Sequence, residues 1–180
     1  MYNKDNEVIP IGDAKEEDKT VTGNGLPKFT MSWNNTFRYK NFDLSLYFRG
    51  AFGFDIFNVH EFYYGMPNVG GAWNRLQGTF EKNGALTTAM NQLTDYFIEK
   101  GDYFKLDVVT LGYTFNLQNT RFLDRVRVYG TVTNVFTITG FSGVDPSTYP
   151  VNGLTPGTYD GDKTYYPSST QVLVGVQVGF

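Results

Sequence analysis

Apolar and polar side chains alternate along five stretches of the chain, each about 11 to 15 residues long. Successive side chains of a β-strand point to opposite faces, so this period of two predicts strands with one apolar and one polar face. The fold class that follows is all-β. The predicted strands cover residues 29–39, 42–54, 103–115, 125–139 and 170–180.

The first two predicted strands form a hairpin, because only Lys40-Asn41 separates them and predicts a tight turn. One face of each strand is apolar, with Asn35 and Gly50 as the interruptions. The apolar positions of this hairpin are Phe29, Met31, Trp33, Phe37, Tyr39, Phe42, Leu44, Leu46, Phe48, Phe52 and Phe54.

The stretch 103–115 changes phase near its middle. Leu111 and Tyr113 share an apolar face in the second half, whereas Phe104 and Leu106 have the opposite parity in the first half. A β-bulge would explain the change, and so would a strand that begins above a membrane. The pattern leaves both explanations open.

The connections between the strands alternate in length. Short turns follow Tyr39 and Phe115, whereas residues 55–102 and 140–168 form long loops, the first with a possible short helix around 86–100. Outer-membrane barrels have short periplasmic turns, long extracellular loops and strands of about 9–11 residues or more. The pattern therefore predicts a segment of an antiparallel up-and-down transmembrane β-barrel, with aromatic side chains near the strand ends at the membrane interfaces.

Five strands do not close such a barrel, and an open sheet edge in lipid leaves backbone groups without hydrogen bonds. The N-terminal residues 1–7 are polar and contain no apolar signal-peptide core. We therefore expect the chain to be part of a larger protein, with residues 1–28 as a surface loop or incomplete start and 29–180 as the C-terminal part of the barrel.

The composition of the chain excludes several classes of site and partner but leaves one other fold possible. The chain has 180 residues, a net charge of −3, 17% aromatic residues and a mean hydropathy of −0.32. No cysteine is present, which excludes disulfides and thiolate metal sites, and the charge gives no reason to expect a nucleic-acid partner. A polar, aromatic-rich composition also suits a soluble β-sandwich that binds carbohydrate, which is the alternative interpretation.

A series of short strings, taken in order, resembles the SusC/RagA family of TonB-dependent outer-membrane transporters. The resemblance covers nearly the whole chain from Gly23 onward. The strings are Gly23-Asn24-Gly25-Leu26-Pro27-Lys28-Phe29, Trp33-Asn34-Asn35-Thr36-Phe37-Arg38-Tyr39-Lys40-Asn41-Phe42-Asp43, Phe48-Arg49-Gly50, Gly101-Asp102-Tyr103-Phe104-Lys105-Leu106-Asp107, Val109-Thr110-Leu111-Gly112-Tyr113, Asn134-Val135-Phe136-Thr137 and the last strand ending in Phe180.

The resemblance implies an outer-membrane transporter that imports glycans or peptides. No Ser/His/Asp or paired-carboxylate arrangement stands out as catalytic in the sequence, so we expect neither an enzyme nor a cofactor. Family members form a large closed barrel with an N-terminal plug, contact the TonB complex through an N-terminal segment, and pair with a SusD-like surface lipoprotein. Phe180 resembles the terminal signal that the barrel-assembly machinery reads, and outer-membrane lipid would surround the barrel. The chain departs from the family in lacking the plug, the TonB-contacting segment and most strands, so transport by this chain alone is not expected.

Few residues stand out as candidate sites. Tyr63, Tyr64 and Trp73 in the first long loop could stack on sugars or contact the lipoprotein, or could simply fold the loop onto itself. Arg38, Asp43 and Arg49 face the predicted lumen, where salt bridges within the wall are expected before a substrate role. His60 is the only histidine, and neither it nor the acidic residues near Glu16 and at Asp160-Gly161-Asp162 predict a metal site.

Overall fold

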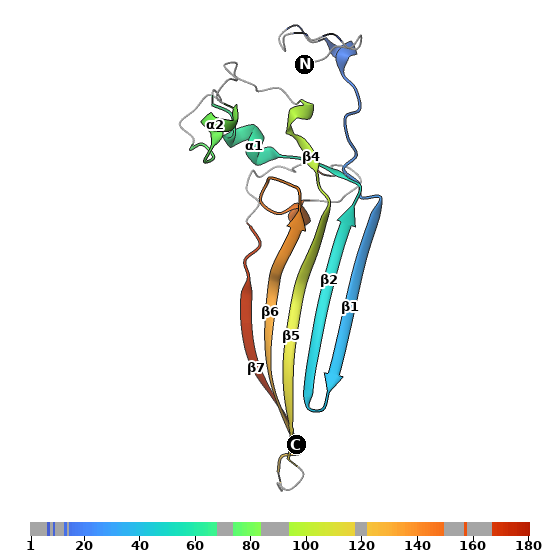
Figure 1. The fold of residues 1–180 in the computed structure, drawn as a ribbon, viewed down its shortest axis with the longest axis vertical. Helices are drawn as coiled ribbons and strands as arrows, with labels where there is room; N and C mark the ends of the chain where they lie inside the picture. Colours follow the sequence, from blue (N-terminus) through green and yellow to red (C-terminus); the bar gives the residue numbers. More distant parts are fainter. Residues whose placement is uncertain are drawn as a thin grey trace.

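A computed structural model describes residues 7, 9, 13, 15–67, 74–83, 94–117, 122–149, 157 and 167–180. Its main feature is one five-stranded antiparallel sheet with strand order β1-β2-β5-β6-β7 (Figure 1). The sequence prediction of antiparallel strands is therefore confirmed. The strands are β1 (Phe29–Tyr39), β2 (Phe42–Phe52), β5 (Tyr103–Asn116), β6 (Arg125–Thr139) and β7 (Gln171–Gly179), within two residues of the predicted bounds.

A β-bulge explains the phase change in β5. Tyr47 of β2 pairs with Val108, but the next residue, Phe48, pairs with Leu106, so Asp107 has no partner on β2. On the other side of β5, residues 134 and 135 of β6 lie across from Asp107. The extra residue moves Phe104 and Leu106 to the same face as the apolar side chains of the second half of β5.

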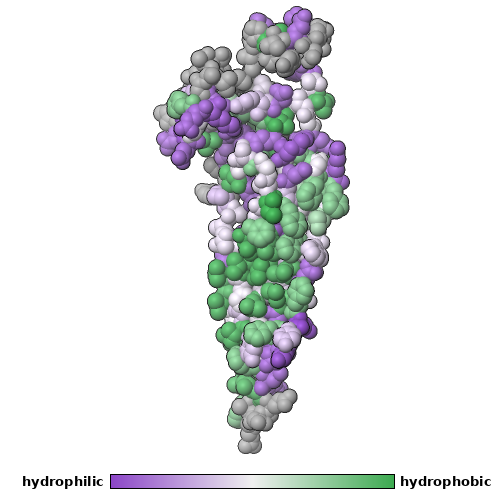
Figure 2. Space-filling model, viewed as in Figure 1, coloured by the Kyte–Doolittle hydropathy of each residue, from purple (hydrophilic) through white to green (hydrophobic). Residues whose placement is uncertain are grey.

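The apolar face of the sheet is continuous and exposed. The rings of Phe48 and Phe104 stack on it at 5.4 Å, yet Trp33 is 53% exposed and Val174 is 74% exposed. No described element packs over this face, and Figure 2 shows hydrophobic side chains gathered over the strands. The second sheet that a β-sandwich needs is therefore absent from the described residues, where the other strands form only a two-stranded sheet.

The described parts of the two long connections lie at one end of the sheet, opposite the β1–β2 turn and the C-terminus (Figure 1). We call their described parts, residues 54–67, 74–83, 94–102 and 140–149, the loop cap. No helix among the described residues is long and apolar enough to cross a membrane. The cap contains β3 (Asp55–Phe57), α1 (Val59–Tyr64), α2 (Thr79–Asn83), the 3₁₀-helices η3 (Asp95–Phe97) and η4 (Pro146–Thr148), and β4 (Ile98–Lys100); a further 3₁₀-helix, η2 (Glu16–Asp18), precedes the sheet.

The helix suggested around residues 86–100 is wrong for its described part. Asp95–Phe97 forms a single 3₁₀ turn, and Ile98–Lys100 is the strand β4, which pairs with β3. Backbone pairing with β3 therefore outweighs the local sequence preference. Residues 84–93 lie outside the described part of the chain.

The string Gly101-Asp102 fixes the path from the sheet into the cap. Gly101 donates its N–H to the carbonyl oxygen of Phe54 at 2.9 Å, and Asp102 Oδ1 accepts the N–H of Gly53 at 2.7 Å. A Cβ on Gly101 would meet the buried side chains of Phe54 and Ile56 at 2.6–2.7 Å. The glycine is needed here because the backbone passes so close to these side chains.

The bulge gives a test of the register. Deleting Asp107 should rotate residues 103–106 to the wrong faces or force β5 to slip, because a one-residue shift reverses every side chain. We expect a large loss of folded sheet in detergent micelles, measured by far-UV circular dichroism and protease resistance. Asp107→Asn is the matched control, since it keeps the residue count. A deletion variant that folds as well as this control would show that the bulge does not set the register.

Candidate interaction site in the loop cap

An aromatic cluster organises the first long loop. Phe97 and Met66 are buried, and Phe57 and Phe62 pack against them. The rings of Phe62 and Phe97 meet edge to face at 5.1 Å, a favoured geometry for aromatic pairs. Helix α1 begins here because the Asn58 side chain accepts the N–H of Glu61 at 3.0 Å, as an N-cap does.

Two of the three predicted contact residues lie beside this cluster. Tyr63 packs edge to face on Phe62 at 5.0 Å, and Tyr64 lies 6.4 Å from Tyr63. Both side chains are partly buried, which agrees with a role in folding the loop onto itself. Trp73 lies outside the described residues.

A polar network ties the two long loops together. The Glu99 carboxylate accepts hydrogen bonds from Asn58 Nδ2 at 2.8 Å, from the Ser142 N–H at 2.8 Å and from Ser142 Oγ at 2.7 Å. The N–H of Phe57 donates to the carbonyl oxygen of Gly157 at 2.9 Å. Since Ser142 and Gly157 belong to the second long loop, the cap is one connected body.

A second polar network supports α2. Asn83 is 1% exposed, and its Nδ2 donates to Glu61 Oε1 at 2.8 Å and to the carbonyl oxygen of Gly65 at 2.7 Å. The Tyr96 hydroxyl donates to Asn83 Oδ1 at 2.5 Å, and Lys82 forms an ion pair with Glu61 at 3.1 Å. A hollow of about 720 Å³ beside α2 is lined by Glu61, Leu76, Gln77, Gly78, Thr79, Glu81, Lys82 and Ser142.

Two of the three charged residues predicted to face the lumen, Asp43 and Arg49, form ion pairs within the wall. Asp43 accepts from Arg127 Nε at 2.9 Å and from its Nη2 at 2.5 Å, while Arg38 stands opposite Asp43 in the β1–β2 ladder. Arg49 pairs with Asp107, the bulge residue. These pairs agree with a structural role.

Two glycines let long side chains lie flat on this polar face. A Cβ on Gly112 would collide with the Arg127 guanidinium and the Asp43 carboxylate, and a Cβ on Gly175 would collide with the Tyr129 ring. The guanidinium carbon of Arg127 also lies 4.9 Å from the centre of the Tyr129 ring, within cation–π distance.

The sequence did not single out Lys105 or Asp145, which meet where the cap joins the sheet. Lys105 is 1% exposed, and its Nζ donates to Asp145 Oδ2 at 3.1 Å and to Ser147 Oγ and Ser168 Oγ at 3.3 Å. A charged residue on the polar face of a strand is ordinary. Lys105 differs from other such residues only in its buried contacts with residues that are distant in the sequence, and no local sequence pattern predicts these contacts.

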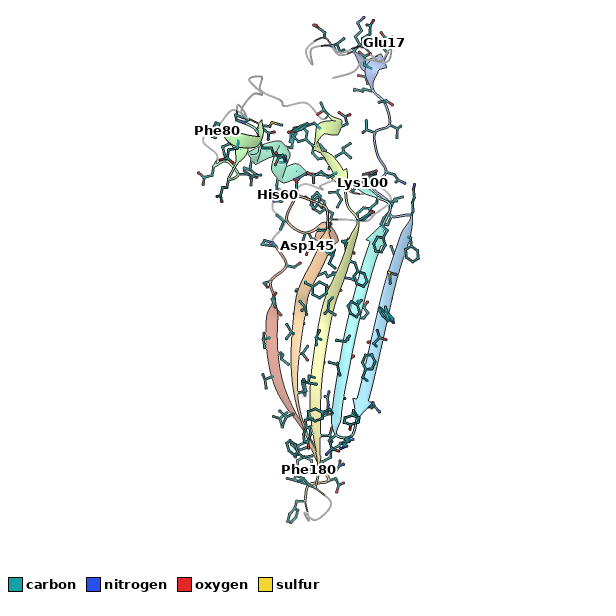
Figure 3. The ribbon with its side chains drawn as sticks, viewed as in Figure 1. Glu17, His60, Phe80, Lys100, Asp145 and Phe180 are labelled. Atoms are coloured by element: carbon teal, nitrogen blue, oxygen red, sulfur yellow. The ribbon has the colours of Figure 1, made fainter. Side chains whose placement is uncertain are left out.

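The other residues considered for a metal site are His60, the acidic residues near Glu16, and Asp160-Gly161-Asp162, and the last of these lies outside the described residues. Among the described residues, no group of three or more His, Asp or Glu side chains is placed to hold a metal ion. Burial lowers the pKa of His60, so its ring is mainly neutral at pH 7. Glu16 instead forms an ion pair with Lys19 at 2.7 Å, and Phe180, at the far end of the sheet, is 88% exposed (Figure 3).

Two carboxylates of the cap predict that its stability depends on pH. Burial opposes the ionisation of Glu99 and Asp145, but hydrogen bonds outweigh it and hold both pKa values below their ordinary 4.5 and 3.8. Their stabilisation is therefore present above these ordinary values and is lost as the pH falls through the lower folded-state values. Pepsin cleavage within the cap should rise steeply between about pH 4 and pH 2.

The double variant Glu99→Gln/Asp145→Asn should show a flatter pH profile in the same digestion, with an unfolded substrate correcting for the protease's own pH dependence. Equal profiles for the parent and the variant would contradict the assignment to these two groups.

No family model matches the chain. Among characterised proteins it is 30% identical to the TonB-dependent receptor P39 of Formosa agariphila over 91% of the chain, and 27% identical to the TonB-dependent receptor SusC of Bacteroides thetaiotaomicron over 94%. The chain spans 17% of the length of each relative.

The fold resembles solved structures of the RagAB peptide transporter. One matches with a TM-score of 0.73 at 20% identity, covering 99% of the chain and 20% of the solved chain. The RagAB peptide importer in its closed-closed state matches with a TM-score of 0.72 at 18% identity, covering the whole chain. By sequence and by fold, the chain is therefore a relative of one part of the TonB-dependent receptors of the SusC/RagA type.

Proposed function

We propose that the chain is the C-terminal part of the outer-membrane barrel of a TonB-dependent transporter that imports a nutrient, a glycan or a peptide. The observation that carries this proposal is the apolar face of the five-stranded sheet, which no described element covers. Contact of such an apolar face with lipid is favourable, whereas its contact with water costs free energy through the hydrophobic effect. On this proposal the chain lies in the outer membrane and has no enzymatic role.

The arrangement of the ends supports the proposed orientation. The β1–β2 turn and Phe180 lie at one end of the sheet, and the loop cap lies at the other (Figure 3). With the short turns on the periplasmic side, the cap faces the cell exterior. Phe180 then stands at the periplasmic rim, where we assign it as the signal for the barrel-assembly machinery.

The proposed partners follow from the relatives. SusC-type proteins are named as TonB-dependent receptors, and RagAB is named as a peptide importer. We assign to this chain a SusD-like lipoprotein as the partner of the outer end and the TonB complex as the energy source, acting through another part of the protein. The partly buried Tyr63 and Tyr64 lie in the cap, where substrate or lipoprotein would arrive.

The alternative, a soluble carbohydrate-binding β-sandwich, has less support. Its apolar valine and phenylalanine side chains should be buried against a second sheet. Val172 and Val174 are instead 73% and 74% exposed. The relatives found by sequence are also TonB-dependent receptors, and the solved structures with a similar fold are those of the RagAB peptide transporter.

The size and location of the native protein test the proposal. An antibody against residues 140–168 should detect, in the outer-membrane fraction of the source cells, a protein several times larger than 20.4 kDa. A band of about that mass in the soluble fraction would overturn the proposal and favour the binding module.

A matched pair of substitutions tests which face meets lipid. Val174 and Leu173 are neighbours on β7, are both exposed and point to opposite faces. Val174→Arg should cost about 2–4 kcal/mol if it faces the bilayer midplane and should strongly reduce the protein assembled in the membrane. Leu173→Arg faces the interior and should assemble near the parent level. Equal assembly of the two variants would contradict the barrel.

A further inference from the structure

The second long loop is fastened to the wall of the sheet at both of its ends. Asp145 and Ser147 lie near its start, and Ser168 lies near its end. All three bond to the same atom, Lys105 Nζ, at distances of 3.1–3.3 Å. One side chain of β5 therefore holds together two points of the loop that are separated by about twenty residues of chain.

The fastening is nearly sealed from solvent. Lys105 is 1% exposed and Asp145 is 6% exposed. Asp145 also accepts the N–H of Ser147 at 2.8 Å and the hydroxyl of Ser168 at 2.5 Å. Lys105 Nζ and both carboxylate oxygens of Asp145 thus have hydrogen-bond partners. A buried ion pair needs such partners if it is to offset the loss of its hydration.

The β-bulge completes the charge balance. Asp107, the extra residue of β5, pairs with Arg49 and lies 3.8 Å from Lys105 Nζ. Arg49 Nη2 also lies 3.5 Å from Ser147 Oγ. Two cations, Arg49 and Lys105, therefore face two anions, Asp107 and Asp145, and the group carries no net charge.

An apolar contact lies beside the ion pairs. Phe141 and Tyr149, on either side of η4, pack edge to face at 5.4 Å. Both belong to one buried cluster with Phe54, Ile56 and Ala51, which comes from the end of β2. Ala51 is 4% exposed. The segment 141–149 thus covers the loop end of the sheet, and a hollow of about 280 Å³ lies between this segment, the end of the loop and the wall.

We propose that Lys105 is a latch that holds the two described ends of the second long loop, at segment 141–149 and at Ser168, against the polar wall of the sheet. Its release lets segment 141–149 lift away and opens the passage at that end. The latch is either closed or open. In a half-open geometry, the charge of Lys105 or Asp145 would be buried with neither its partner nor water to bind it. The inference that release of Lys105 opens a passage rests on the proposed transporter function. The inference that Lys105 holds the loop rests only on its contacts with Asp145, Ser147 and Ser168.

A buried reporter measures the opening. The chain contains no cysteine, so Ala51→Cys introduces one thiol beneath segment 141–149. In the full-length protein, the rate of reaction with N-ethylmaleimide then follows the lifting of the segment. Lys105→Met and Asp145→Asn should each raise this rate at least about tenfold, the effect of losing one hydrogen bond to a charged group.

The double variant Lys105→Met/Asp145→Asn should react no faster than the faster single variant, because the two residues act as a pair. Lys100→Met is the matched control. Lys100 is also a lysine at the base of the cap with an ion pair, to Asp55 at 2.7 Å, but its side chain is 77% exposed. This control should leave the rate within twofold of the parent.

Ser168→Ala gives a readout if the charge variants fold poorly. It removes one hydroxyl from the latch without leaving a lone charge, and it should raise the labelling rate by a smaller factor with the strands still protease-resistant. Parent-like rates in all latch variants, or an equal rise in Lys100→Met, would overturn the latch. Labelling does not depend on transport, so failure of the proposed transporter function would leave this result interpretable.

Discussion

The apolar face of the five-stranded sheet needs a neighbour other than water. A fully exposed valine or phenylalanine side chain forgoes about 1.5–3 kcal/mol relative to a buried one, and this face carries many of them. The other features of the chain are consistent with lipid as that neighbour. The strands are long, the backbone is paired in one meander, and polar side chains occupy the opposite face.

The strands could be predicted from the sequence because a period of two is a local property. From Phe29 to Tyr39, the polarity of each side chain indicates which face of the strand it lies on, and this does not depend on its contacts in the folded sheet. The break in phase at Asp107 was visible too, although its cause became clear only from the neighbours of β5 on both sides. A bulge is defined by how one strand pairs with its neighbours, so the sequence of one strand alone does not identify it.

The cap could not be predicted in the same way. Ile98–Lys100 forms a strand because residues about forty positions earlier pair with it, and Lys105 is buried because residues of the second long loop close over it. Both depend on contacts distant in sequence. The contact role of Tyr63 and Tyr64 stays a prediction, since the ring contacts described for them are with neighbours in α1.

The two glycines beneath Arg127 and Tyr129 have a geometric consequence for the space inside the proposed barrel. Without a Cβ at Gly112 and Gly175, the guanidinium and the phenol ring rest along the wall and do not project across it. The diameter of a barrel is set largely by its number of strands, so the remaining bore depends on how far side chains reach inward. The wall is thin at these two glycines, and the carboxylate of Asp43 balances the charge of Arg127. The inner surface is therefore smoother here than it would be if the same two side chains projected inward.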